Sequence, residues 1–138
     1  MVSIHSVPLT EVSRYGILSG IWEDKENTIL NVSAMNEKPK ASYAEEFLGV
    51  RGNDGKKEYC SVFGQYILTP EVFQQLETDI RKADEGNDHT REIELTSALE
   101  AVRSNHGMMG VRLDGEMYDM GNPDALCRCV AAFSKPKE

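Results

Sequence analysis

The chain has 138 residues, of which 40% are hydrophobic and 28% are charged, with a formal net charge of −8 and three cysteines. This length fits one domain with a sizeable core, and the acidic balance argues against a broad phosphate-neutralising surface for nucleic acid. The apolar runs are too short to span a bilayer, and the odd cysteine count argues for a reducing compartment, so we expect a cytoplasmic protein without nucleic-acid or membrane partners.

Three short apolar runs near the amino terminus are predicted β-strands: Val2–Val7, Ile17–Trp22 and Thr28–Met35. Between the first two runs, Leu9–Gly16 has the composition of a turn. The polar cluster of residues 23–27 separates the second run from the third. These two strands are therefore predicted to form an antiparallel hairpin.

The third run leads into a Glu-Lys-Pro sequence. Strict alternation places the apolar side chains of the run on one face: Leu30, Val32 and Ala34. Glu37 and Lys38 follow side by side, and Pro39 removes a ladder donor and ends the pairing. Adjacent strand residues point to opposite faces, so an ion pair is not the obvious use of this dipeptide. A carboxylate and an ammonium at a strand end suit a ligand with hydroxyls and a phosphate; solvated surface charges are the alternative.

The middle of the chain alternates between helical and extended patterns. Ser42–Leu48 has brief helical spacing, Gly49–Lys57 is predicted to be a loop, and Tyr59–Leu68 is the run most typical of a strand. A helix follows, with Thr69 as its cap and Pro70 in its first turn. Its apolar stripe consists of Val72, Phe73, Leu76 and Ile80.

A second helix is predicted over about Arg91–Ser104, ending near Gly107. Its apolar face consists of Leu95, Ala98, Leu99 and Val102. Beyond it, Asp114-Gly115 is a hairpin signal between two predicted strands, Met108–Leu113 and Glu116–Met120.

The chain closes with an amphipathic helix that Asn122 caps and Pro123 begins. Leu126, Val130 and Phe133 form its apolar face and are expected to point inward. Cys60 is expected to be a buried small hydrophobic residue, and Met108 and Met109 to fill core.

Together these elements predict one α/β domain over residues 1–138, with a mixed β-sheet, antiparallel hairpins and flanking helices. The first predicted strand begins at the start of the chain, and the sequence strongly predicts only three helices. A mixed sheet of this kind normally carries helices on both faces. We therefore expect sheet surface or a sheet edge to be covered by a partner, a second copy or a missing half.

Five stretches, in this order, resemble the C-terminal half of bacterial UTP–glucose-1-phosphate uridylyltransferases. They are Ser13–Ile17, Glu37–Pro39, Phe63–Leu68, Glu92–Thr96 with Ala98, and Tyr118–Asn122. The resemblance extends from Val2 to Phe133 and implies the C-terminal half of a Rossmann-like nucleotidyltransferase fold. Its Tyr-Gly, Glu-Lys-Pro and Asp-x-Gly elements are shared with the broader sugar-1-phosphate nucleotidyltransferase superfamily.

The first half of the family enzyme, which holds a Gly-rich loop for the nucleoside triphosphate, has no counterpart in the chain. Residues 52–57 have the wrong spacing for that loop, and a hairpin loop is the better interpretation. We therefore expect the N-terminal nucleotide-binding half to be absent, and this chain alone to transfer little or nothing.

In the family reaction, glucose-1-phosphate attacks the α-phosphate of UTP to give UDP-glucose and pyrophosphate, so the protein acts by alignment and charge neutralisation. The resemblance implies that Lys38 is the catalytic cation on the sugar phosphate and that Asp119 holds Mg²⁺. It also implies that Glu37 accepts hydrogen bonds from two sugar hydroxyls, that Gly16 lies against the sugar, and that Val62 offers a main-chain contact.

Each assignment has a structural alternative. Asp119 could accept hydrogen bonds in the turn before the last helix, and Gly16 could serve a backbone turn. Thr96 and Glu94 are expected in solvated or core-facing roles. For the whole chain, the alternative is a non-catalytic sugar-phosphate-binding or oligomerisation module derived from a nucleotidyltransferase.

Overall fold

The computed structural model describes residues 1–86, 93–115, 117–118, 120–121 and 123–134. Its strands are β1 (Val2–Val7), β2 (Gly16–Trp22), β3 (Ile29–Glu37), β4 (Val50–Arg51), β5 (Lys57–Tyr66) and β6 (Met109–Arg112). Its helices are η1 (Leu9–Arg14, a 3₁₀-helix), α1 (Ala41–Phe47), α2 (Pro70–Glu85), α3 (Leu95–His106) and α4 (Pro123–Phe133). The predicted mixed α/β class and the β2–β3 hairpin are confirmed.

The sheet closes on itself. Its strands run in the order β1-β6-β3-β2-β5-β4, and β1 also pairs with β5. Five strands therefore form a small barrel to which β4 is added by a short antiparallel pairing with β5. The β1–β6 pairing is parallel and the others are antiparallel. Because closure pairs both sides of β1 and of β6, the expected open sheet edges are largely removed.

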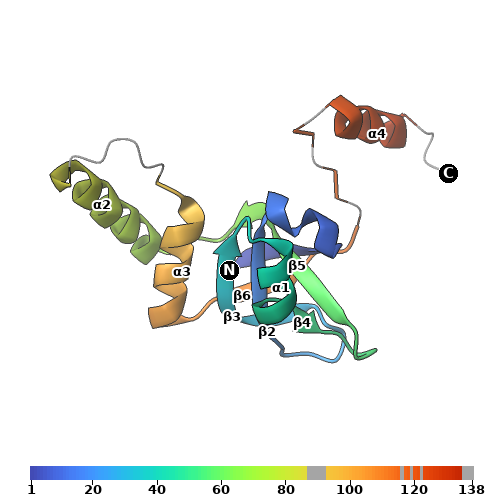
Figure 1. Cartoon of the computed structure of the whole chain (residues 1–138), viewed down its shortest axis with the longest axis horizontal. Helices are drawn as coiled ribbons and strands as arrows, with labels where there is room; N and C mark the ends of the chain where they lie inside the picture. Colours follow the sequence, from blue (N-terminus) through green and yellow to red (C-terminus); the bar gives the residue numbers. More distant parts are fainter. Residues whose placement is uncertain (87–92, 116, 119, 122, 135–138) are drawn as a thin grey trace.

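Two clusters of buried side chains lie on the two sides of the β2–β3 ribbon. The first cluster includes Ile4, Leu18, Leu30 and Cys60, and the apolar faces of α2 and α3 pack against it. The second joins the barrel to η1 and α1. Figure 1 shows α2 and α3 together on one side of the barrel. Ala44 of α1 is buried with Ile17 of β2 and Tyr59 of β5 in the second cluster. The predicted inward face of α3 is confirmed, and Cys60 is fully buried as expected.

A β-bulge in β3 changes which residues face the first cluster. Ser19 pairs with Ala34 but Gly20 pairs with Val32, so Ser33 is an extra residue in β3. Beyond the bulge the parity of the strand shifts by one, because two residues oppose one on the partner strand. The predicted face of Leu30, Val32 and Ala34 is therefore wrong at its last member: Met35 joins the first cluster and Ala34 packs against the second.

The predicted C-terminal hairpin is not formed. β6 lies between β1 and β3 and pairs with both, so neither of its edges is free for a following strand. Met117, Tyr118 and Met120 lie outside strands, and the remainder of the expected second strand falls outside the described residues. The local Asp114-Gly115 signal is overridden because β6 already has two ladder partners.

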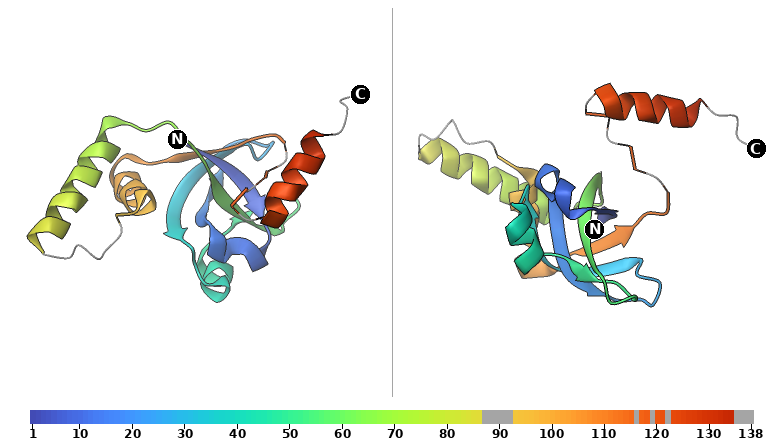
Figure 2. Two further views of the ribbon diagram at one scale, coloured as in Figure 1. Left: turned by 90° about the horizontal axis from the view of Figure 1, so that it is seen from above. Right: turned by 45° about the vertical axis from the view of Figure 1, so that its right-hand side comes forward.

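The last helix begins at Pro123 as predicted, and its predicted cap, Asn122, lies outside the described residues. Its apolar face does not point inward. Leu126, Val130 and Phe133 are all exposed, and Figures 1 and 2 show α4 set away from the barrel. An amphipathic pattern predicts which face a helix would bury, not that a surface is available to receive it. The predicted α2 stripe is likewise split, because Val72 is buried while Phe73 and Ile80 are exposed.

Two smaller expectations also change. Met108 is buried but Met109 is exposed, and α3 begins at Leu95 rather than near Arg91, since Ile93 and Glu94 precede the helix. A hairpin loop over residues 52–56 joins β4 to β5 as predicted, but the wider predicted loop Gly49–Lys57 also contains β4 and the first residue of β5. None of the helices in the described ranges is long and apolar enough to cross a membrane.

Candidate functional site

The Glu-Lys-Pro sequence lies where β3 ends beside the start of β2. Glu37 is the last residue of β3 and pairs with Gly16, the first residue of β2. The main-chain N–H of Lys38 then donates to the carbonyl of Tyr15 at 3.0 Å. The β2–β3 ladder therefore brings the Tyr-Gly and Glu-Lys-Pro sequences, about twenty residues apart, into one place.

The missing side chain of Gly16 leaves room for the Glu37 carboxylate. A Cβ atom at position 16 would lie 2.9 Å from Glu37 Oε2, closer than real Cβ contacts allow. Side chains two residues apart on a strand share a face, so Glu37 lies on the same face as Met35. That is the face that the bulge turns toward the first cluster. The bulge therefore decides on which side of the ribbon this carboxylate lies.

Thr96 completes the surroundings of that carboxylate. Its hydroxyl donates to Glu37 Oε2 at 2.8 Å, and both side chains are partly buried. Thr96 lies in the first turn of α3, where the helix dipole also favours a neighbouring negative charge. The sequence predicted a solvated or core-facing role for Thr96. Thr96 belongs to Glu92–Thr96, one of the five stretches that resemble the family. No spacing pattern in the sequence indicates its contact with Glu37, which is 59 positions away.

Lys38 departs from the strand in a left-handed conformation. Its φ is +44°, a region that L-residues without a local hydrogen-bonding side chain adopt at a cost. The turn ends the strand alternation, so Lys38 Nζ lies 3.8 Å from Glu37 Oε1 instead of on the opposite face. The expectation that an ion pair is not the obvious use of this dipeptide is therefore corrected, although 63% exposure of the lysine side chain makes the pair weak.

Two residues of β5 border the same region. Burial raises the pKa of the Tyr66 phenol, and the nearby Glu37 carboxylate raises it further. Val62 is half-buried against the first cluster. β5 pairs with β2 through Ile17 and Ser61, so Val62 lies one residue beyond that pair, in the direction of Gly16. Tyr66 belongs to Phe63–Leu68, one of the five stretches that resemble the family, but it was not predicted as a site residue.

The predicted metal ligand Asp119 lies outside the described residues. Within the described ranges, no group of three or more His, Cys, Asp or Glu side chains is arranged to hold a metal ion. Glu37 itself is engaged by Thr96 and Lys38. The described part of this region therefore fits a ligand with hydroxyls and an anionic group, and does not by itself form a Mg²⁺ site.

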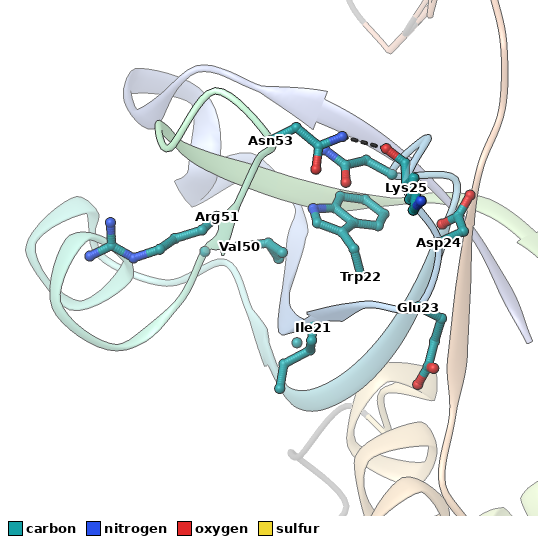
Figure 3. Close-up of a pocket in the computed structure, with 11 residues that line it drawn as sticks. Ile21, Trp22, Glu23, Asp24, Lys25, Val50, Arg51 and Asn53 are labelled. Carbon is teal, nitrogen blue, oxygen red and sulfur yellow. Dashed lines mark hydrogen bonds between the residues drawn. The ribbon is translucent and has the colours of Figure 1, made fainter.

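A separate open pocket of about 560 Å³ lies at the other end of the β2–β3 hairpin. Figure 3 shows the Trp22 indole in it, with the Asn53 side chain bonded to the Lys25 carbonyl and with Arg51 pointing away. Asp24, also in its wall, accepts hydrogen bonds from Thr28 and Ile29, which hold the pKa of its carboxyl below the ordinary value. These polar groups serve the hairpin turn, and the pocket does not include Glu37 or Lys38.

Comparison with known proteins gives concordant results. Residues 1–135 match the Nucleotidyl transferase family. The chain is 34% identical over 121 residues to a UTP–glucose-1-phosphate uridylyltransferase of Staphylococcus haemolyticus, covering 88% of this chain and 35% of that protein. It is 30% identical to the enzyme of the same name from Streptococcus pneumoniae, covering 88% of this chain and 34% of that protein.

Solved structures show the same relationship. A UDP-glucose pyrophosphorylase complexed with UDP-glucose is 26% identical, with a TM-score of 0.72 over 96% of this chain and 43% of that chain. An apo UDP-glucose pyrophosphorylase is 27% identical, with a TM-score of 0.71 over 96% of this chain and 41% of that chain. The chain thus spans about a third of the length of the curated relatives that it matches.

Proposed function

The chain belongs to the nucleotidyl transferase family, and we propose that it is the sugar-phosphate-binding part of a UTP–glucose-1-phosphate uridylyltransferase. The observation that carries this proposal is the cluster of Gly16, Glu37, Lys38 and Thr96 at one end of the β2–β3 ribbon. It combines a held carboxylate with an exposed ammonium, the two groups that a sugar phosphate requires. The uridylyltransferase names of the relatives support the choice of glucose-1-phosphate and UDP-glucose as ligands.

In the proposed reaction an oxygen of the glucose-1-phosphate forms a bond to the α-phosphorus of UTP, and the bond to the pyrophosphate leaving group breaks. Glu37 accepts hydrogen bonds from sugar hydroxyls and so orients the nucleophile. Lys38 lies against the sugar phosphate and reduces the repulsion between two approaching anions. Gly16 allows the sugar close to the main chain, and the carbonyl or N–H of Val62 contacts it from β5.

Asp119 is proposed as a ligand of Mg²⁺, which when bound would neutralise phosphate charge. UTP would be held by an N-terminal half beyond these residues, so residues 1–138 are proposed to be one domain that transfers little or nothing alone. The missing half or a second copy of this chain is the proposed protein partner, and the cytoplasm the proposed location.

Calorimetric titration of the 138-residue chain with glucose-1-phosphate tests the binding proposal. Lys38→Met and Glu37→Gln are each expected to weaken binding about tenfold or more, because each removes a charged partner. Lys40→Met and Glu45→Gln, exposed residues nearby in the sequence, serve as matched controls and should leave binding unchanged. Equal affinity in all four variants would contradict the proposal.

A pyrophosphate-release assay with UTP, Mg²⁺ and glucose-1-phosphate tests the proposal that this chain binds the sugar phosphate and an N-terminal half binds UTP. The expected result is little or no turnover by this chain and recovery when the nucleotide-binding half is supplied. Robust turnover by the isolated chain would show that the triphosphate is held by residues within it.

The exposed apolar face of α4 favours a second candidate, an oligomerisation or non-catalytic sugar-phosphate-binding module. Leu126, Val130 and Phe133 form one exposed row on that helix, and large exposed apolar surfaces usually mark interfaces. Light scattering separates the cases: a monodisperse monomer that binds no glucose-1-phosphate would contradict both roles.

A further inference from the structure

We propose that Thr96 is a positioning residue that anchors one oxygen of Glu37, so that the other oxygen, Oε1, is the one that meets the sugar hydroxyls. This inference rests on the proposed sugar-phosphate function and adds to it a residue from α3. It assigns different tasks to the two carboxylate oxygens.

The contacts of Oε2 define the anchored side. Oε2 accepts the Thr96 hydroxyl at 2.8 Å, and it also lies where a Cβ of residue 16 would be 2.9 Å away. The Thr96 methyl group, Cγ2, would lie 3.7 Å from that same Cβ position. Oε2 therefore already accepts one hydrogen bond, from Thr96, and lies next to the position that a Gly16 side chain would occupy.

The contacts of Oε1 define the open side. The Lys38 ammonium lies 3.8 Å from Oε1, beyond ordinary hydrogen-bond distance, and the Lys38 side chain is largely exposed. A carboxylate oxygen can accept two hydrogen bonds, so Oε1 can receive sugar hydroxyls beside Lys38. Without Thr96, a glutamate with three free torsions would have to be ordered by the ligand itself, which weakens binding.

The test uses calorimetric titration of the 138-residue chain with four probes: glucose-1-phosphate, its 2-deoxy and 3-deoxy analogues, and inorganic phosphate. Thr96→Val keeps the shape and removes the hydroxyl, and Thr96→Ser keeps the hydroxyl. Thr96→Val is expected to weaken glucose-1-phosphate binding roughly tenfold, the effect of one hydrogen bond to a charged group. Thr96→Ser should stay within about threefold of the wild type.

The decisive readout is hydroxyl discrimination, the affinity ratio between glucose-1-phosphate and its deoxy analogues. A purely structural role for Thr96 would lower all affinities together. The positioning role predicts that the ratio collapses in Thr96→Val, is retained in Thr96→Ser, and that inorganic phosphate binds all three proteins alike because Lys38 is untouched. Thr78→Val, which removes a hydroxyl bonded within α2, is the matched control and should leave every value unchanged.

Gly16→Ala provides a second, independent variant should Thr96→Val unfold. Its new methyl group would lie 2.9 Å from the present position of Oε2 and would displace it, and the same loss of discrimination is expected. A wild-type chain that discriminates hydroxyls while Thr96→Val discriminates equally well overturns the Thr96 inference and leaves the proposed function intact. A wild-type chain that binds glucose-1-phosphate no better than inorganic phosphate overturns both.

Discussion

Gly16 and Glu37 face each other across the β2–β3 ladder so closely that a single methyl group at position 16 would lie 2.9 Å from the Glu37 carboxylate. Neither residue marks a site by itself, since glycines begin many strands and glutamates end many. Their pairing places the Glu37 carboxylate beside the space that a side chain at position 16 would fill.

Gly16→Ala is expected to weaken glucose-1-phosphate binding about tenfold while the chain stays folded. The atom that the new Cβ meets is the end of a flexible side chain, so the carboxylate moves aside and the backbone does not. Titration calorimetry measures the affinity, and circular dichroism checks the fold. Unchanged affinity would show that the position of the Glu37 carboxylate does not matter for binding.

Lys38 is expected to lower the stability of the fold through its backbone conformation while its ammonium group supports ligand binding. Its positive φ costs a side chain roughly 1–2 kcal/mol, a cost that glycine avoids and a β-branched residue bears in full. Lys38→Gly should therefore be more stable than Lys38→Val by about that amount in urea unfolding, although both lose the ammonium and bind glucose-1-phosphate poorly. Equal stability of the two variants would argue against a strained conformation at this residue.

Asp24 is expected to stabilise the β2–β3 turn at neutral pH. Hydrogen bonds from Thr28 and Ile29 lower the pKa of its carboxyl below the ordinary 3.8. A folded-state pKa below the unfolded one means that this stabilisation is complete above pH 3.8 and is lost as the pH falls through the lower, folded value. Asp24→Asn should lower Tm at pH 7, and the difference from the wild type should shrink in acid.

The control for Asp24→Asn is Glu26→Gln, an exposed carboxylate in the same turn. It should leave Tm unchanged at both pH values. A constant Tm difference between Asp24→Asn and the wild type from pH 7 to pH 2 would refute the linkage to this carboxyl.

Cys60 is expected to resist alkylation in the folded protein. Burial raises the pKa of its thiol to about 11, and the opposing effect of the nearby Arg112 is smaller. Iodoacetamide at pH 8 should therefore label the exposed Cys127 well before Cys60, and Cys60 only in denaturant. Mass spectrometry of the peptides gives both rates, and comparable rates in the native state would contradict the buried position.

The difference in burial between α2 and α4 can be measured by making the same valine-to-alanine substitution on each helix. Val72 on α2 is 3% exposed and Val130 on α4 is 59% exposed. Val72→Ala should cost roughly 1–3 kcal/mol of unfolding free energy, whereas Val130→Ala should change it by less than about 0.5 kcal/mol. A comparable loss for Val130→Ala would show that α4 packs against apolar surface in solution, as the assembly role requires.

Much of the local structure could be predicted because its causes are local. Short apolar runs located β1, β2 and most of β3, and the spacing of Ala98 and Leu99 identified the inner face of α3. The order of short motifs placed the Glu-Lys-Pro sequence in the correct family. In each case, the residues that determine the outcome are neighbours in the sequence.

The sequence by itself therefore determined most of the helices and strands, the family and the presence of Glu37 and Lys38 at a strand end. Only the tertiary structure decided that the sheet closes into a barrel, that β6 has no free edge for a hairpin, and that α4 stands away from the core. It also decided, through one extra residue at Ser33, that Glu37 faces α3 and reaches Thr96. The physical reason is that strand pairing and a side-chain contact across 59 residues depend on which surfaces meet in the folded chain. The periodicity of the sequence predicts the faces of single helices and strands, but not which of these faces come together.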